Sequence, residues 1–488
     1  MFQKYFFLPK LNSFKLVWSR RYIWKLLLLT FCLLALIAVN FQPTVQYAVR
    51  MAIHRSELYN KLFAPSDAGG CRVNYSIPEV DTFIREYQGK SNLLDSVFKV
   101  DEQEPYLSFL AKLNKWKRKG KLMKEFVKNN NTWAWEIFHQ QINQYFLYDP
   151  EDTSYYQQML KDLNQRKIIF TDVNNRSSHL VLIVTFDNGM KGLYKFMRTP
   201  RDHEVLPNHF FFSDIERAHA EIASFHLDKV LGFYRVPPTV GRVLNITEDI
   251  GNVGVELLTS TLHRSPVGNL CFFGKCKDYC KVAFSICGTP DTIEGAMSVF
   301  LPPRGINQSH YSVASPWMRV YHHTGKATWE LSEDYCETNV KKREGFQGRK
   351  LLDYSDIGVF DFLIGNLDRH HVELFQQFNN DTFILHLDNG RGFGKSKYDC
   401  MSCMSPVRQC CMIRRSTLAK LVKLYIGPDS LSHVLRKSLE ADPLSPILWE
   451  PHLDALDRRV GLILKVVRDC IAKKGKLWHE VIIDDGYN

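Results

Sequence analysis

The sequence predicts a two-lobed α+β protein behind an N-terminal membrane segment, and three observations support this. Residues 167–197 contain three short segments rich in β-branched and aromatic residues, separated by polar turns, as in an antiparallel sheet. One amphipathic helical segment follows at 213–233, and beyond about residue 290 the pattern is mostly helical. Residues 22–42 are strongly apolar. A strand-rich part with one helix, followed by a helical part, is typical of two-lobed α+β proteins.

The N-terminal segment holds much of the net charge of +11, since residues 1–25 contain six Lys or Arg and no acidic residue. A nucleic-acid-binding function therefore loses most of its support. The run LLLLTFCLLALIAV at 26–39, with its apolar flanks, is about long enough to span a bilayer as a helix. Its basic N-terminal side predicts a cytosolic N-terminus. We favour an uncleaved signal-anchor over a cleaved signal peptide, and both place the remainder in the lumen.

Cysteines and glycosylation sequons agree with a lumenal location. Four of the 12 cysteines crowd into residues 271–287, and Cys410 and Cys411 are adjacent. A zinc site is the alternative, but the spacing is not a paired CxxC arrangement and the lumenal context favours disulfides. Asn-x-Ser/Thr sequons occur at Asn74, Asn130, Asn175, Asn245, Asn307 and Asn380.

The remaining elements follow in order. Residues 86–165 repeat apolar positions at three- and four-residue intervals, which predicts helices, one of them over 135–148. The helix at 213–233 carries Glu216, with Ser213 or Asp214 as its N-cap. A hairpin-like insert at 381–394 interrupts the helical part. The predicted boundaries are a cytosolic tail at 1–21, the anchor at 22–42, a lumenal stem at 43–85, a helical extension at 86–165, an N-lobe at 166–290 and a C-lobe at 291–488.

Five residues stand in the order that phosphoryl transfer uses in protein kinases. Lys195 lies near the end of a predicted strand, and Glu216 follows 21 residues later. Asp368 is followed five residues later by Glu373 and then by Asp388, where kinases place a catalytic Asp, a metal-binding Asn and a metal-binding Asp. No Gly-rich loop precedes Lys195, and Asn-Gly follows Asp388 in place of Phe-Gly. From spacing alone, capping or turn roles for Asp368 and Asp388 remain open.

The segments IGNLDRHHVELF and LHLDNGRGFGK carry a more specific resemblance, together with HAEIASFHLDKVLGFYRVPPTVGRV, IEGAMSVFLP, RQCCMIRRSTL and LSPILWEPHLDALDRRV. Over about 133–475 the chain resembles the secretory-pathway kinases called "family with sequence similarity 20". This family includes a Golgi casein kinase that phosphorylates Ser-x-Glu, a xylose kinase and a pseudokinase, and the chain is most similar to the casein kinase. The resemblance implies an atypical two-lobed protein-kinase-like α+β fold, with a strand-rich N-lobe, a helical C-lobe, an N-terminal helical extension and stabilising disulfides.

The resemblance also implies site residues, with ATP and Mn²⁺ or Mg²⁺ as ligands. Asp368 matches the catalytic Asp, and Glu216 and Asp388 match the metal-binding residues. The other nucleotide-binding positions are Lys195, Glu373, His179 (in place of a nucleotide-contacting Gln) and the backbone of Ser298, Val299, Phe300 and Leu301. The implied disulfides are Cys271–Cys287, Cys276–Cys280, Cys336–Cys410 and Cys411–Cys470, while Cys400 and Cys403 are additional and have no assigned partner.

The expected function is a lumenal serine/threonine protein kinase acting on secreted proteins, with Ser-x-Glu as the expected motif. The alternatives are a xylose kinase of the glycosaminoglycan linker and a pseudokinase scaffold that activates a related kinase. Glu216 stands where the pseudokinase has Gln, which favours activity, and DNGRGFG resembles the protein kinase member. The expected location is the Golgi membrane in type II orientation, or secretion after cleavage. The expected assembly is a homodimer, or a heterodimer with a related kinase or pseudokinase.

Overall fold

The computed structural model describes residues 77–88, 121–126, 132–149, 152–175, 177–206, 216–302, 310–322, 325–346, 348–475 and 480–483. The predicted cytosolic tail, the predicted anchor and most of the predicted stem lie outside these residues. Among the helices that are described, none has the length and apolar character needed to cross a membrane.

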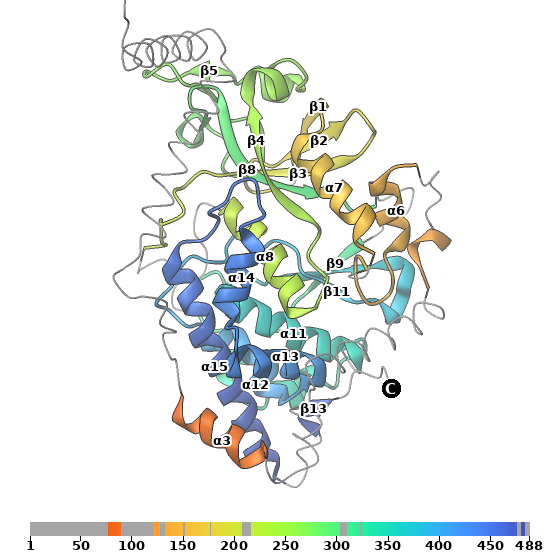
Figure 1. Cartoon of the computed structure of the whole chain (residues 1–488), viewed down its shortest axis with the longest axis vertical. Helices are drawn as coiled ribbons and strands as arrows, with labels where there is room; N and C mark the ends of the chain where they lie inside the picture. Colours follow the sequence, from red (N-terminus) through yellow and green to blue (C-terminus); the bar gives the residue numbers. More distant parts are fainter. Residues whose placement is uncertain are drawn as a thin grey trace, which may run out of the picture. The chain divides into compact units, whose positions relative to one another are not determined.

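A five-stranded antiparallel sheet forms the N-lobe, drawn in the upper half of Figure 1. Its strands, in spatial order, are β1 (Ile168–Val173), β2 (Leu182–Phe186), β3 (Lys191–Phe196), β8 (Thr292–Val299) and β4 (Thr239–Asn245). The three strands predicted within 167–197 are confirmed. Strand β8 begins beyond residue 290, the predicted end of the N-lobe, and pairs with β3 on one side and with β4 on the other. Buried and half-buried residues largely alternate along it.

Helix α8 (Ala218–Leu231) packs against β4 and β8 and ends at Gly232, whose φ of 80° is the left-handed conformation of a glycine C-cap. It begins at Ala218 rather than near residue 213, so Glu216 lies just outside the helix on which it was predicted. The preceding residue Arg217 is extended, and its N–H donates to the Gly390 carbonyl at 2.7 Å. This contact with a distant loop holds Arg217 outside the helix.

Helices α6 (Ala134–Gln141) and α7 (Thr153–Gln165) precede the sheet. The predicted helix over 135–148 therefore stops at Gln141. The Asn143 side-chain oxygen accepts hydrogen bonds from the N–H groups of Tyr145 (2.8 Å) and Phe146 (3.0 Å). This local turn competes with helix formation, and it directs the aromatic residues that follow into the protein interior.

Helices dominate the C-lobe, as predicted, and occupy the lower half of Figure 1. They are α10 (Thr328–Leu331), α11 (Arg349–Ile364), α12 (Ser405–Cys410), α13 (Arg415–Ile426), α14 (Leu431–Leu439) and α15 (Glu450–Lys474). Helix α3 (Pro78–Gln88) packs against α15. Short elements complete the described chain: α9 (Glu256–Thr259), the sheet β5 (His263–Arg264), β6 (Leu270–Phe272), β7 (Ile286–Cys287), the sheet β9 (His310–Ala314), β10 (His371–Phe375), β11 (Ile384–Leu385), and the pair β12 (Ile413–Arg414), β13 (Ile482–Ile483).

Five disulfides lie within the described residues. Four of them are the predicted pairs Cys271–Cys287, Cys276–Cys280, Cys336–Cys410 and Cys411–Cys470, which are confirmed. The fifth joins Cys400 to Cys403, the two cysteines for which the sequence suggested no partner. The zinc alternative for residues 271–287 is thereby excluded, because all four sulfur atoms are paired.

A buried ion network connects α11 to two other segments. Asp353 and Asp356, almost fully buried on α11, face Arg235, which precedes β4, and Arg414 of β12. The Thr417 hydroxyl donates a further hydrogen bond to Asp356 at 2.7 Å. Burial favours the neutral form of Asp353, but the neighbouring guanidinium groups outweigh it and lower its pKa to about 2.

Asp356→Ala should lower the free energy of unfolding by about 3 kcal/mol or more, because it leaves two buried guanidinium groups short of a carboxylate. Denaturant unfolding followed by fluorescence or circular dichroism measures this change. Asp429→Ala is the matched control, since Asp429 is exposed and its loss should change stability by less than about 0.5 kcal/mol. Equal stabilities of the two variants would contradict the role given to the network.

Candidate functional site

The Lys195 ammonium group lies among three carboxylates at the junction of the lobes. Lys195, on β3, places Nζ 2.6 Å from Glu221 Oε1, 3.1 Å from Glu216 Oε2 and 3.1 Å from Asp388 Oδ1. Glu221 belongs to α8, Glu216 to the segment before it, and Asp388 to the loop after β11. The predicted Lys195–Glu216 contact is therefore present, but the nearest carboxylate is Glu221, which the sequence analysis missed.

The charges of this cluster perturb each other strongly. Burial alone would lower the pKa of Lys195, but the three carboxylates outweigh it and raise the pKa well above its usual value. Burial opposes ionisation of Glu216, yet Lys195 and His179 hold its pKa far below the usual range. Burial raises the pKa of Glu221, and repulsion from Asp388 and Glu216 adds to this effect. Together they outweigh the attraction of Lys195, which would lower the pKa. The cluster contains three carboxyl groups and only one ammonium group. This surplus of acidic groups can attract a further cation.

His179 lies beside Glu216 and connects the site to the disulfide-bonded insert. Its Nδ1 atom is 3.6 Å from Glu216 Oε1, and its ring stacks on Tyr279 with a centroid separation of 4.5 Å. Tyr279 lies within the Cys276–Cys280 loop, and its N–H donates to the Ser178 carbonyl at 3.0 Å. The structure therefore places His179 at the site, as predicted, with the insert as its support.

The loop that carries Asp388 is held against α8. Asp388 adopts a left-handed backbone conformation with φ of 58°. The next residue, Asn389, donates its N–H to the Glu221 carboxylate at 3.2 Å. A Cβ atom at Gly390 would lie 3.1 Å from the Glu216 side chain and 3.3 Å from Glu221, so this close approach favours glycine. The Asp-Asn-Gly sequence is thus a turn, as its composition suggested, and it also delivers Asp388 to Lys195.

Asp368 lies in the loop after α11, and both of its carboxylate oxygens are engaged. Arg391 Nε is 2.8 Å from Oδ2, while the Tyr321 hydroxyl and His370 Nδ1 contact Oδ1. Burial would raise the pKa of Asp368, but the hydrogen bonds from His370 and Tyr321 and the charge of Arg391 lower it below its usual value. The same contact with Asp368 raises the pKa of His370. Asp368 is therefore an ionised, well-oriented acceptor of hydrogen bonds.

Arg369 joins the Asp368 loop to the Asp388 loop. Its guanidinium group binds the Asp361 carboxylate of α11 at 2.8 and 3.0 Å, the Leu387 carbonyl, and the Asn389 side-chain oxygen at 2.9 Å. The Asp368 N–H in turn donates to the Asn366 side chain at 3.0 Å. One half-buried arginine therefore fixes the separation of the two loops that present Asp368 and Asp388.

A second buried link runs from α8 to the Asp388 loop. Asp228 accepts a hydrogen bond from His386 Nδ1 at 2.9 Å and from the N–H groups of Arg235 (2.8 Å) and Val236 (3.2 Å). Because a carboxylate only accepts, His386 must carry its proton on Nδ1. The position of Asp388, two residues further on, is thus coupled to the end of α8.

The predicted adenine segment, Ser298 to Leu301, forms the end of β8 and the chain beyond it. The Ser298 hydroxyl lies 2.8 Å from the Thr239 hydroxyl. The Phe300 N–H donates to the Lys191 carbonyl at 2.9 Å, and the Phe300 carbonyl lies 2.9 Å from His139 Nε2 on α6. This segment connects the sheet that carries Lys195 to the rest of the chain.

Glu373 is held by side chains of the neighbouring strand. It is on β10, where its carboxylate contacts His310 and Ser312 of the neighbouring strand β9. Strand β10 begins at His371, so Glu373 is presented from a strand rather than from a loop. Its part in nucleotide binding stays a prediction.

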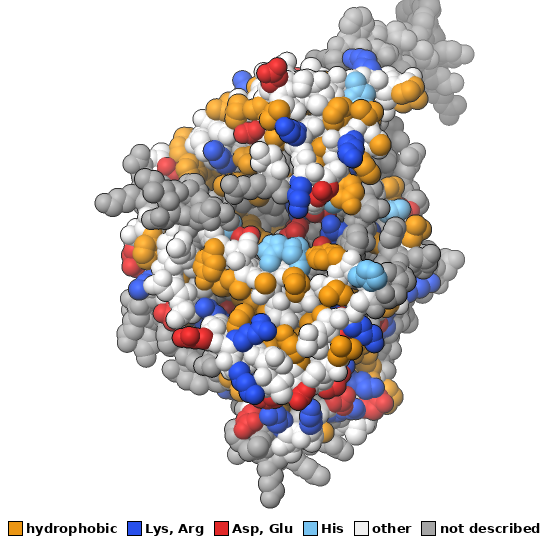
Figure 2. Space-filling model, turned by 180° about the vertical axis from the view of Figure 1, so that it is seen from behind, with side chains coloured by type: hydrophobic (Ala, Val, Ile, Leu, Met, Phe, Trp, Pro, Cys, Tyr) orange, Lys and Arg blue, Asp and Glu red, His pale blue; other side chains and the backbone are white. Residues whose placement is uncertain are grey.

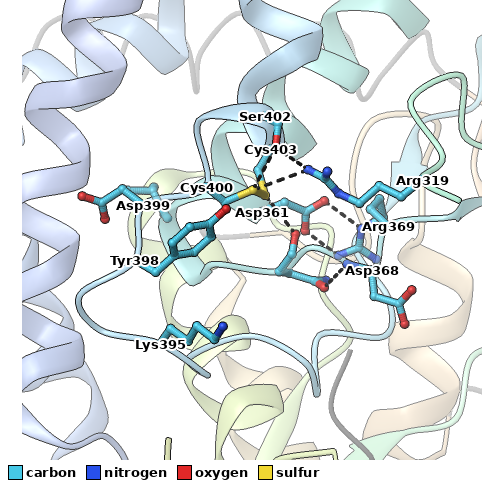
Figure 3. Close-up of a disulfide and its surroundings, with 12 residues drawn as sticks. Arg319, Asp361, Asp368, Arg369, Lys395, Tyr398, Asp399, Cys400, Ser402 and Cys403 are labelled. Atoms are coloured by element: carbon cyan, nitrogen blue, oxygen red, sulfur yellow. Dashed lines mark hydrogen bonds and ion pairs between the residues drawn. A yellow bond between two sulfur atoms is a disulfide. The ribbon is translucent and has the colours of Figure 1, made fainter. Parts of the chain in front are cut away.

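The Cys400–Cys403 disulfide lies behind the Asp368 loop (Figure 3). Cys403 Sγ is 3.4 Å from the Asn366 carbonyl oxygen. On the other side, Arg319 donates to the Ser402 hydroxyl at 2.6 Å and to Cys400 Sγ at 3.5 Å. Beside the disulfide is a cavity of ≈ 40 Å³, large enough only for water. The disulfide therefore supports the loop from behind, while Asp368 points away from it.

On the face of the protein seen in Figure 2, acidic, basic and histidine side chains gather around a hollow. Within the described residues, no three His, Cys, Asp or Glu side chains are arranged to hold a metal ion by themselves. Glu216 and Asp388 can supply two carboxylate ligands, and a cation bound there would need phosphate or water oxygens to complete its shell. This donor set fits a divalent ion that enters together with a phosphorylated ligand.

Four of the residues that build the site were not identified from the sequence. These are Glu221, Tyr321, Arg369 and Arg391. A helix predicted to start at residue 218 would have contained Glu221 and excluded Glu216. Glu221 would then have been the candidate for the helix glutamate that pairs with Lys195. The other three act through contacts between segments far apart in the chain, which no local pattern signals.

Comparison with known proteins gives a consistent result. Residues 133–478 match the model of the family described as Golgi casein kinase, C-terminal, Fam20. The Drosophila melanogaster extracellular serine/threonine protein CG31145 is 46% identical over 339 residues, covering 69% of this chain and 64% of that protein. The human extracellular serine/threonine protein kinase FAM20C is 44% identical over 353 residues, covering 72% of this chain and 60% of that protein. The chain thus spans less than two thirds of the length of both proteins.

The fold is also that of a solved structure. A crystal structure of the Golgi casein kinase with Mn/ADP bound superposes with a TM-score of 0.74 at 35% identity, covering 86% of this chain and 96% of that one. Related proteins described as a pseudokinase and as a glycosaminoglycan xylosylkinase also match. The predicted kinase-like α+β fold is therefore confirmed.

Lys195→Met should lower the free energy of unfolding by about 3 kcal/mol in the absence of divalent cations, because three carboxylates then face each other without their ammonium group. Added Mn²⁺ should raise the melting temperature more in this variant than in the wild type. Thermal denaturation with and without Mn²⁺ measures both effects. Lys341→Met, which removes a surface pair with Glu337, is the control and should show the wild-type response. Equal Mn²⁺ responses in all three proteins would rule out these carboxylates as the cation site.

The His370–Asp368 pair should contribute to stability in a pH-dependent way. Because the pKa of His370 is raised in the folded protein, its contribution is fully present below the ordinary value of 6.5 and is lost as the pH rises through the raised pKa. The difference in melting temperature between wild type and His370→Gln should therefore be larger at pH 6 than at pH 9. His433→Gln, at an exposed position, is the control. A difference that does not change with pH would refute the pairing.

Proposed function

The chain belongs to the Fam20 family, and we propose that it is a protein kinase that transfers the γ-phosphoryl group of ATP to serine in secreted proteins, within Ser-x-Glu motifs. The observation that carries this proposal is the assembly of Lys195, Glu216, Glu221 and Asp388 beside Asp368. A fixed ammonium, a pair of metal-binding carboxylates and a separate ionised Asp are the groups that phosphoryl transfer requires.

The nucleotide would bind between the N-lobe sheet and the Asp388 loop. Lys195, which Glu221 holds at 2.6 Å, offers a permanent positive charge to the phosphates. A divalent ion, Mn²⁺ or Mg²⁺, would be held by Glu216 and Asp388 and would neutralise charge on the transferred group. The related Golgi casein kinase structure with Mn/ADP bound supports this choice of ligands.

Asp368 would orient the acceptor hydroxyl and accept its proton. Its lowered pKa keeps the carboxylate ionised at neutral pH. Arg391 fixes one oxygen, and the other receives the Tyr321 hydroxyl. An acceptor serine would take the place of this tyrosine hydroxyl, since both are O–H donors to the same oxygen. Arg369 keeps Asp368 at a constant separation from the Asp388 loop during transfer.

Two other functions occur among the relatives. The presence of Glu216 speaks against a pseudokinase. Its pKa is strongly lowered and it contacts Lys195 at 3.1 Å, which supports the proposed metal-binding role. A xylose kinase would use the same nucleotide site with a sugar hydroxyl as acceptor. The sequence DNGRGFG favours the protein kinase, and the acceptor assay below separates the two.

For location and partners, we infer a lumenal protein of the Golgi membrane, anchored by residues 22–42 in type II orientation or secreted after cleavage. Five disulfides within the described residues support an oxidising compartment. Asn175 and Asn380 are exposed and suit glycosylation, while Asn245 is half-buried and caps a turn through its side chain. Asn74, Asn130 and Asn307 lie outside the described residues. A homodimer, or a heterodimer with a related kinase or pseudokinase, is the proposed assembly.

Asp368→Ala should reduce phosphate transfer to below a few per cent of wild type while leaving nucleotide binding largely intact, because Asp368 contacts the acceptor rather than the phosphates. Incubation of the purified protein with labelled ATP and Mn²⁺ or Mg²⁺, with casein and a xylosylated tetrasaccharide as acceptors, measures transfer. Binding of Mn²⁺–ADP is measured separately by calorimetry.

Asp388→Ala is the companion variant and should lose both transfer and Mn²⁺-dependent nucleotide binding. Label in casein alone supports the protein kinase, and label in the tetrasaccharide alone supports the xylose kinase. If wild type labels neither acceptor with either metal, both enzyme functions are refuted and the scaffold function remains. If Asp368→Ala keeps more than a few per cent of activity, its catalytic assignment is wrong.

A further inference from the structure

The last residue of β8, Val299, has a carbonyl that its partner at Pro238 cannot satisfy. The Val299 N–H donates to the Pro238 carbonyl at 2.9 Å, which makes these two residues a hydrogen-bonded antiparallel pair. In such a pair the partner normally donates its own N–H in return, but Pro238 has none. The Val299 carbonyl therefore remains an acceptor that the partner strand does not use.

The backbone groups of the next residue, Phe300, bind partners on the side opposite Pro238. The Phe300 N–H donates to the Lys191 carbonyl, and its carbonyl lies 2.9 Å from His139 Nε2. Because the peptide unit is planar and trans, the Phe300 carbonyl and the Leu301 N–H lie in one plane and point in opposite directions. Whatever fixes the Phe300 carbonyl therefore fixes the direction of the Leu301 N–H. His139 makes that contact.

His139 is built into the fold as a neutral donor. It lies on α6 and is 4% exposed. Burial lowers the pKa of His139 to about 4, so the ring is neutral at physiological pH, and a carbonyl partner requires the proton on Nε2. Its Nδ1 atom is buried without a hydrogen-bond partner. An apolar side chain would avoid that cost, so packing alone does not account for a histidine here.

The segment that carries His139 is attached to both lobes. Trp135 Nε1 donates to the Asn188 carbonyl in the β2–β3 turn at 3.3 Å. Beyond α6, Arg349 at the start of α11 donates to the Gln144 carbonyl, and the Leu147 N–H donates to the Tyr234 carbonyl at 2.9 Å. His139 is therefore held at a fixed position relative to the N-lobe turn and the C-lobe helix, and through it so is the segment at 299–301.

We propose that His139 is a positioning residue for the nucleotide base: it orients the 300–301 peptide so that the Leu301 N–H and the Val299 carbonyl together face the ligand. One donor and one acceptor, two residues apart on an extended chain, match the adjacent ring nitrogen and exocyclic amine of adenine. Guanine presents a donor and an acceptor in the reverse order. This inference rests on the proposed nucleotide-binding function and assigns to the helical extension a part in choosing the base.

The test compares His139→Phe, which keeps an aromatic ring but removes the donor, with His139→Gln, whose amide can still donate. In the full-length protein, His139→Phe should raise the KM for ATP about tenfold, as expected for one lost hydrogen bond. The kcat value and the KM for the protein acceptor should change less than about twofold. The preference for ATP over GTP should fall. His139→Gln should restore at least half of the lost ATP affinity. His139→Leu replaces the Phe variant if that variant does not fold.

Trp135→Phe is the matched control, because it removes another polar contact of α6, the bond to the Asn188 carbonyl, and should lower the melting temperature without changing the KM for ATP. The inference is overturned if His139→Phe lowers the melting temperature as Trp135→Phe does and leaves the KM for ATP and the ATP/GTP preference unchanged. Direct binding of ADP separates this outcome from failure of the proposed function. A wild type that binds ADP but transfers no phosphate refutes the kinase, while the binding comparison still tests His139.

Discussion

The Lys195 ammonium group is the point on which the two lobes converge. One cation at the end of a strand contacts carboxylates from α8, from the segment before it and from the loop after β11. Removing a single positive charge would leave three negative groups within a few ångströms, and Coulomb repulsion would drive them apart. The surrounding arrangement follows from this constraint: the extended Arg217, the left-handed Asp388 and the close approach of Gly390 each let a carboxylate reach the same nitrogen.

Polar groups hold α8, the Asp388 loop and α11 together, in addition to apolar packing. Asp228 ties the end of α8 to His386, Arg369 ties Asp361 to the Asp388 loop, and Arg235 meets Asp353 and Asp356. Charged groups in such positions are costly to desolvate, but each specifies one partner and one geometry. A site that must hold carboxylates within hydrogen-bond distance of one another needs such directional restraints more than additional hydrophobic contact.

Much of this could be read from the sequence, and the errors have identifiable physical causes. Strand and helix periodicity located the sheet, the single N-lobe helix and the helical C-lobe, and family resemblance located four disulfides. The helix start near 213 and the helical reading of 142–148 failed because Gly390 and Asn143 offer the backbone alternative hydrogen-bond partners. Glu221 and Arg369 were missed because their partners lie on other elements, Lys195 on β3 for Glu221 and the Asp388 loop for Arg369, and no local pattern signals such contacts.

Each of the disulfides described above cross-links residues within one lobe. Two of those within the described residues, Cys271–Cys287 and Cys276–Cys280, lie in the insert of the N-lobe, and the other three lie in the C-lobe. None of the five spans the gap where Lys195 meets Asp388. Among the residues that the structure describes, covalent stiffening is thus confined to the interior of each lobe. The connection between the lobes consists of the backbone and of bonds that can break and re-form at thermal energies, so the lobes can separate and close around a ligand without any change in the redox state of the protein.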